Sequence, residues 1–91
     1  MYMFMDALAS GAERCGVPKG KALIYAAATM IGAAKMVQKS PLTPEQLKNN
    51  VCSPGGSTIA GVNVLNAGGF TETIMECVEA AYKRNQELGK Y

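Results

Sequence analysis

A long apolar segment constrains the fold of this chain more than any other feature. Residues 22–37 are almost continuously apolar, and the pattern predicts a helix from Pro18 to Lys39 with apolar side chains nearly all round. Such a helix is buried on most sides, yet a 91-residue chain buries only roughly 60–65% of its unfolded surface. The sequence therefore predicts a helix at the centre of a homodimer, and the alternative is the central helix of a monomeric bundle.

The remaining segments also have helical periodicity, and no run of residues has the pattern of a strand. Helices are predicted over residues 2–15, 44–51, 58–66 and about 70–88. The helix start at Thr43 is strong, because Thr43 can cap it and Gln46 can return a hydrogen bond to the cap residue. We expect an all-α helical bundle that forms one domain over residues 1–91, as an intertwined dimer. The predicted buried side chains include Cys15, Tyr25, Ile74, Met75, Cys77, Val78, Ala81 and Tyr82.

Composition argues against several classes of function. The formal net charge is only +2, the charges are scattered and tryptophan is absent, so a nucleic-acid partner is not expected. The absence of histidine removes Ser–His and Cys–His nucleophile pairs and histidine metal ligands, and no metal site is expected. The apolar segment is too short for a membrane span, which needs about 20 residues. Three cysteines without a Cys-x-x-Cys pair predict reduced thiols in a cytoplasmic protein.

The segment from Val51 to Gly61 is the candidate site. Pro54 fixes its own φ, and Gly55 and Gly56 allow backbone angles closed to other residues and leave room for a ligand. Ser57 and Thr58 follow where a helix should start, and the first N–H groups of a helix have no partner inside it. These groups attract a carboxylate or a phosphate. The alternative is a well-capped loop between two helices, with no ligand.

The amino-acid sequence of this segment closely resembles the signature of pyrroline-5-carboxylate reductases. The resemblance rests on Ser-Pro-Gly-Gly-Ser-Thr-Ile-Ala-Gly at residues 53–61, followed by Leu65 and Gly-Gly-Phe at 68–70. Upstream, Gly-Ala-Ala-Lys-Met at residues 32–36 is similar to a helix of the same family. The match covers nearly the whole chain, from Tyr2 to Lys90, and it is the combination of motifs that is specific.

The resemblance implies a role for each residue of the loop. Ser53, Gly55, Gly56, Ser57 and Thr58 would bind the substrate, with the main-chain N–H groups of the last three on its carboxylate. The Thr58 hydroxyl would face the ring nitrogen, as the catalytic group, unless it caps the helix instead.

Residues just before the loop would lie on the cofactor side of the substrate. The resemblance places Asn50 and Val51 near the nicotinamide, and Cys52 with them. The resemblance supports the roles of these three residues less closely than the roles of the loop residues.

The resemblance also implies an activity. Members of this family reduce 1-pyrroline-5-carboxylate to L-proline with NADP or NAD, in proline biosynthesis, and they hold the cofactor in an N-terminal Rossmann domain. This chain is similar to their C-terminal domain only, so we expect a homodimer or higher homo-oligomer with a small-molecule substrate. The isolated chain is expected to bind no cofactor and to be inactive. Two alternatives remain, a stand-alone non-catalytic helical association module and an anion-binding helical domain of another enzyme.

Overall fold

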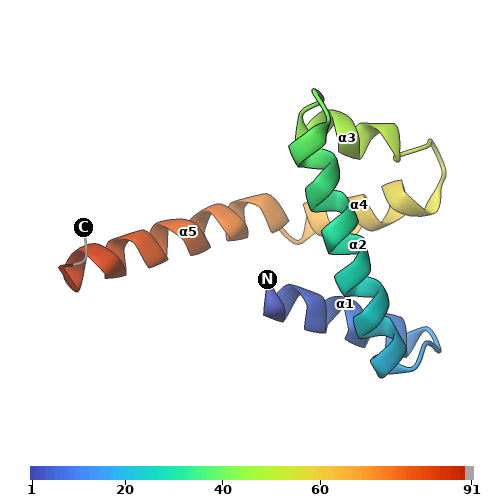
Figure 1. Ribbon diagram of the computed structural model, residues 1–91, viewed down its shortest axis with the longest axis horizontal. Coiled ribbons are helices and arrows are strands. Elements are labelled where there is room, and N and C mark those ends of the chain that lie inside the picture. The colour runs from blue at the N-terminus through green and yellow to red at the C-terminus, as the bar shows by residue number, and fades with distance from the viewer. Residues whose placement is uncertain (90–91) are drawn as a thin grey trace. The chain divides into compact units, whose positions relative to one another are not determined.

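A computed structural model describes residues 1–89 of the chain (Figure 1). The described residues form five helices and no strand, which confirms the all-α prediction. In chain order the helices are α1 (Tyr2–Arg14), α2 (Lys19–Lys39), α3 (Pro44–Asn50), α4 (Ser57–Ala67) and α5 (Phe70–Glu87). The chain divides into two compact units, the first covering Met1–Gln46 and the second beginning at Leu47.

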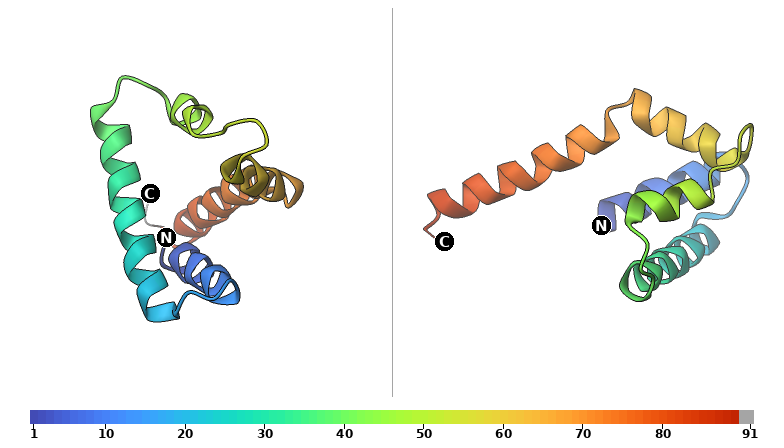
Figure 2. Two further views of the ribbon diagram at one scale, coloured as in Figure 1. Left: turned by 90° about the vertical axis from the view of Figure 1, so that its right-hand side faces the viewer. Right: turned by 90° about the horizontal axis from the view of Figure 1, so that it is seen from above.

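In the first unit, α1 and α2 pack against each other, as the views in Figure 2 show. The chain reverses between them at Gly16, which has a φ of +98°. Gly16 N–H donates to the Glu13 carbonyl and Val17 N–H to the Ala12 carbonyl, each at 3.0 Å. This pair of bonds is the Schellman motif, which satisfies carbonyls left open at a helix end and favours glycine at the reversal. The predicted helix end at this point is confirmed.

Alanines form the contact between α1 and α2. Ala9, Ala22 and Ala26 are the buried apolar residues of the described chain, and their small side chains let the two backbones approach closely. At the edge of this contact the Lys19 ammonium lies 3.1 Å from an Asp6 carboxylate oxygen. The first unit is therefore a helix pair fixed by contacts within the chain.

The start of α3 has the predicted capping box. Thr43 N–H donates to Gln46 Oε1 at 2.9 Å, and Gln46 N–H donates to Thr43 Oγ1 at 3.2 Å. Each side chain thus satisfies a backbone donor that the helix itself leaves open.

In the second unit, α4 and α5 share only a small contact, and α5 runs away from α4 (Figures 1 and 2). Gly69 stands between them with a φ of +71°, a backbone conformation that glycine adopts without steric cost. Neither helix contains a buried residue. The apolar side chains of these two helices are consequently at most partly covered within the single chain.

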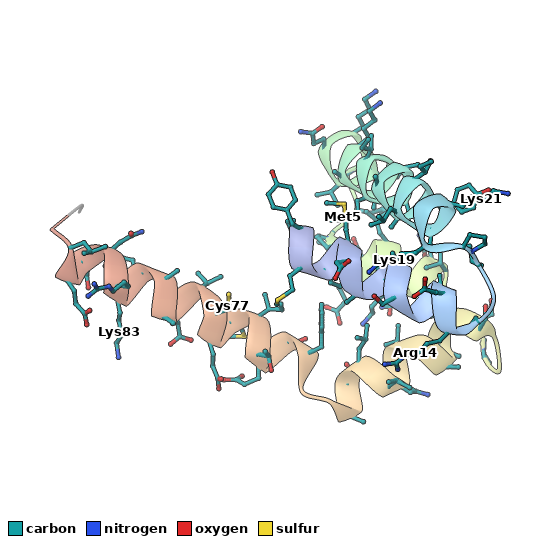
Figure 3. The ribbon with its side chains drawn as sticks, turned by 90° about the horizontal axis from the view of Figure 1, so that it is seen from below. Met5, Arg14, Lys19, Lys21, Cys77 and Lys83 are labelled. Carbon is teal, nitrogen blue, oxygen red and sulfur yellow. The ribbon has the colours of Figure 1, made fainter. Side chains whose placement is uncertain are left out.

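The predictions of burial are wrong for the single chain. Tyr25 is 60% exposed, and Cys15 and Cys77 are exposed too (Figure 3 shows Cys77 and Lys83 on α5). The predicted buried face of α5 is also exposed, although it is apolar along one side as expected. Periodicity identifies which side of a helix is apolar, but the partner that covers that side is not encoded in the period. No described helix is both long enough and apolar enough to cross a membrane.

Candidate functional site

The predicted loop residues form a tight turn ahead of α4. Gly56 N–H donates to the Ser53 carbonyl at 3.0 Å, which closes a four-residue turn over Pro54 and Gly55. Gly55, the third residue of the turn, has a φ of +73°. Proline in the second position and a positive φ in the third define a type II turn, and this turn requires glycine or asparagine in the third position. We name residues 53–59 the donor turn, because the first N–H groups of α4 follow the turn directly.

The donor turn carries main-chain donors that no residue of the described range 1–89 uses. Gly56 caps α4, and no side chain makes a capping hydrogen bond there. The first bond of the helix runs from Ala60 N–H to the Gly56 carbonyl at 3.3 Å. Among the described residues, the N–H groups of Ser57, Thr58 and Ile59 are therefore without an acceptor. They lie at the positive end of the helix dipole, where an anion is stabilised.

No side-chain charge competes with these donors locally. Residues 49–71 contain no acidic or basic side chain, and the first turn of α4 has no acidic residue. Within residues 49–71, a carboxylate at this position would meet N–H groups and hydroxyls and no charged side chain. Attraction of this kind depends on geometry more than on net charge, which suits recognition of one small anionic ligand.

The structure changes which backbone donors can serve. Gly56 N–H, which was predicted to bind the carboxylate, donates instead to the Ser53 carbonyl. Ile59, which the sequence reasoning missed, has a free N–H, because the first intrahelical bond of α4 runs from Ala60 N–H to the Gly56 carbonyl. This donor could have been predicted from the sequence, because the first N–H groups of a helix have no partner inside it whatever their side chains are.

The Thr58 hydroxyl is not a helix cap. Gly56 occupies the cap position with an extended backbone, at φ −83° and ψ 174°. Thr58 is exposed, and no hydrogen bond to its side chain is formed among the described residues. The alternative that Thr58 caps the helix is therefore excluded. Its hydroxyl is available to a ligand beside the free N–H groups.

The two glycines of the turn have different constraints. Gly55 needs its positive φ, whereas the backbone of Gly56 is open to any residue, so only Gly55 uses the conformational freedom that the sequence allows both glycines. The constraint at Gly56 is space, because an added Cβ would lie 3.2 Å from the Ser53 carbonyl oxygen. Both glycines are thus explained by the turn, one through its torsion angle and the other through a close approach.

Asn50, Val51 and Cys52 connect α3 to the turn. Asn50 ends α3, and the N–H groups of Val51 and Cys52 each donate 3.2 Å bonds to carbonyls of the last turn of that helix. Val51 is exposed, and Cys52 is half-buried with a free thiol. Their place near a cofactor remains a prediction. No cluster of three or more His, Cys, Asp or Glu side chains that could hold a metal ion occurs in residues 1–89.

Residues 1–88 match the family model described as pyrroline-5-carboxylate reductase dimerisation. The chain belongs to this family. It is 49% identical over 88 residues to pyrroline-5-carboxylate reductase of Pisum sativum, a match that covers 97% of this chain and 32% of that protein. It is 45% identical over 87 residues to pyrroline-5-carboxylate reductase 2 of Homo sapiens, covering 96% of this chain and 27% of that protein. The family resemblance predicted from residues 32–36 and 53–70 is confirmed.

Solved structures of the family have the same fold. A pyrroline-5-carboxylate reductase of Coxiella burnetii superimposes with a TM-score of 0.90 at 34% identity, over 96% of this chain and 32% of that chain. A Plasmodium falciparum pyrroline carboxylate reductase with NADP bound gives 0.85 at 35% identity, over 88% of this chain and 30% of that chain. The present chain spans about a third of the length of these relatives.

Proposed function

We propose that this chain is the dimerisation and substrate-binding part of an NAD(P)H-dependent pyrroline-5-carboxylate reductase, which makes L-proline in the last step of proline biosynthesis. The observation that carries the proposal is the donor turn in a chain of this family. Its free N–H groups suit the one carboxylate of 1-pyrroline-5-carboxylate. The Thr58 side chain is exposed, and its hydroxyl makes no hydrogen bond among the described residues.

The donor turn would bind and orient the substrate. The N–H groups of Ser57, Thr58 and Ile59 would hold the carboxylate, and the Thr58 hydroxyl would donate a hydrogen bond to the ring nitrogen. This nitrogen is where electron density rises when a hydride reaches the adjacent carbon of the C=N bond. A donor fixed at that atom stabilises the transition state more than the ground state.

The hydride would come from NADPH or NADH, bound mostly outside residues 1–89. These residues contain no strand, and so they lack the strand–turn–helix with which a Rossmann fold holds the pyrophosphate. The P. falciparum relative, with NADP bound, is about three times as long as this chain. We propose that a Rossmann domain elsewhere in the protein holds the cofactor, with Asn50 and Val51 on its nicotinamide side. The free thiols accord with a reducing compartment such as the cytoplasm.

Activity of the whole protein tests the assignment. The chain joined to its cofactor-binding domain should oxidise NADPH or NADH only when 1-pyrroline-5-carboxylate is added, with proline as the product. The 91-residue chain alone should give no turnover above a blank without protein. Failure of the whole protein would overturn the proposed function, and turnover by the 91-residue chain would overturn the location of the cofactor.

The proposed assembly is a homodimer, alone or within a larger homo-oligomer. Large apolar side chains stand exposed along α2, including Ile24, Tyr25 and Ile31. A monomer rarely leaves so much contiguous apolar surface in water. Sedimentation equilibrium at micromolar concentration should give twice the chain mass or a multiple of it, and a stable folded monomer there would contradict the proposal.

A further inference from the structure

Pro54 lies in the donor turn without packing against a core. Its side chain is exposed, and as a proline it has no backbone N–H to donate. It occupies the second position of the type II turn that the bond from Gly56 to Ser53 closes. The φ required at that position is about −60°, which is the value that the proline ring fixes. Pro54 therefore restricts the backbone to the conformation that the turn needs.

Gly55 supplies the other half of this restriction. Its φ is +73°, and an added Cβ there would meet nothing within 4 Å. The constraint at this position is the torsion angle and not the space around it. Together, Pro54 and Gly55 give the chain the two successive backbone conformations of a type II turn directly before α4.

Little else within the described residues fixes the start of α4. No side chain caps the helix, and none of its residues is buried. Its first bond, from Ala60 N–H to the Gly56 carbonyl, is long at 3.3 Å. The directions of the free N–H groups of Ser57, Thr58 and Ile59 therefore depend on the turn that precedes them.

We propose that Pro54 and Gly55 are positioning residues, which hold the donor turn in its binding conformation before the substrate carboxylate arrives. The proposal rests on the proposed function, because it concerns the same carboxylate, and it adds a role in affinity for Pro54. A protein whose binding conformation is only partly populated binds its ligand more weakly in proportion to that fraction. Because the bound substrate orders the turn in any case, both residues act on KM and not on kcat.

Substitution of Pro54 in the whole protein tests the effect on affinity. Pro54→Ala should raise KM for 1-pyrroline-5-carboxylate about two- to fivefold, because alanine frees the backbone that proline restricts. The values of kcat and of KM for NADPH or NADH should stay at those of the wild type. Pro41→Ala is the matched control, since Pro41 is also exposed but lies before α3, outside the donor turn, and it should leave every constant unchanged.

Two substitutions of Gly55 separate the torsion angle from side-chain bulk. Asparagine adopts a positive φ more readily than alanine, although its side chain is larger. If the torsion angle positions the donors, Gly55→Asn should raise KM for the substrate less than Gly55→Ala does. A larger or equal rise for Gly55→Asn would mean that bulk decides the effect, and it would overturn the positioning role of Gly55.

The result for Pro54→Ala decides the proposal independently of the proposed function. A wild-type KM in this variant would overturn the positioning role of Pro54, and so would an unchanged KM with a lowered kcat or melting temperature. These outcomes leave the proposed function standing, because it fails only if the wild-type whole protein does not reduce 1-pyrroline-5-carboxylate.

Discussion

The two units of this chain are built on different principles. In Met1–Gln46 the helices are fixed by contacts within the chain, namely the alanines between α1 and α2, the Asp6–Lys19 ion pair and the reversal at Gly16. From Leu47 onward no described residue is buried, yet the donor turn lies there. The comparison indicates that intrachain packing and the proposed chemistry are assigned to separate parts of the chain.

Substitutions should therefore separate stability from activity. Changes inside the first unit should lower stability and leave the chemistry of correctly folded protein intact, and changes at the donor turn should do the reverse. All stability comparisons need a fixed chain concentration, because association contributes to apparent stability.

The largest effect is expected from Thr58→Ala in the whole protein. Loss of a hydrogen bond to a group that carries charge costs about 1.5–3 kcal/mol, so kcat/KM should fall roughly ten- to a hundredfold. Because Thr58 does not cap α4, the melting temperature should stay close to that of the wild type. Thr71→Ala is the matched control, as it removes an exposed threonine hydroxyl away from the donor turn and should leave kcat/KM unchanged. A lowered melting temperature with normal kinetics would leave Thr58 as a structural residue.

In the first unit, Ala9→Leu should give the largest loss of stability. Ala9 is fully buried in the α1–α2 contact, and overpacking a tight contact costs about 1–3 kcal/mol. The melting temperature should fall by about 4–8 °C for each kcal/mol in a domain of this size. Ala7→Leu makes the same change on an exposed side of α1 and should have little effect. If both variants melt alike, the alanine contact does not hold the first unit together.

Local features were predictable from the sequence because their causes are local. The capping box of Thr43 and Gln46 and the reversal at Gly16 each depend on a few adjacent residues. Burial of Tyr25 and Cys77 was predicted wrongly for the single chain, because an apolar side of a helix says nothing about what covers it.

The site was predictable as a set of residues and less so as a set of atoms. Ser53 to Thr58 do lie in one turn at a helix start, as the motif indicated. Which N–H groups are free depends on the hydrogen bonds of the turn and of the first helical residues, and the motif does not specify these bonds. The N–H of Gly56 is used because the turn bonds it to the Ser53 carbonyl, and the N–H of Ile59 is free because the first intrahelical bond begins at Ala60.

A third pair of substitutions compares glycines in the two units. Gly55→Ala places a Cβ on a backbone with φ +73° and should destabilise the protein by about 1–2 kcal/mol. Gly20→Ala lies inside α2, where an added Cβ meets nothing within 4 Å, and should stabilise by up to about 1 kcal/mol. Thermal melting of both variants gives the signs. A stabilising Gly55→Ala would mean that the turn relaxes without its positive φ and that the donor turn is not rigid.

The smallest effect is expected for Asp6→Asn, which removes the charge that pairs with Lys19. The Lys19 and Asp6 side chains are 40% and 65% exposed, so water screens the attraction and the pair should contribute below about 1 kcal/mol. In the second unit, Glu87→Gln removes the pair with Arg84, which joins residues of one helix at 66% and 64% exposure, and should cost about 0.2–0.5 kcal/mol or less.

Salt should distinguish these two pairs from contacts that hold the fold. At about 1 M salt the screening length falls to about 3 Å, so the difference in melting temperature between wild type and Asp6→Asn should shrink. The Ala9→Leu difference should persist at the same salt concentration, since overpacking is a steric effect. A loss from Asp6→Asn that matched Ala9→Leu and resisted salt would mean that the ion pair, and not the alanine contact, fixes α1 against α2.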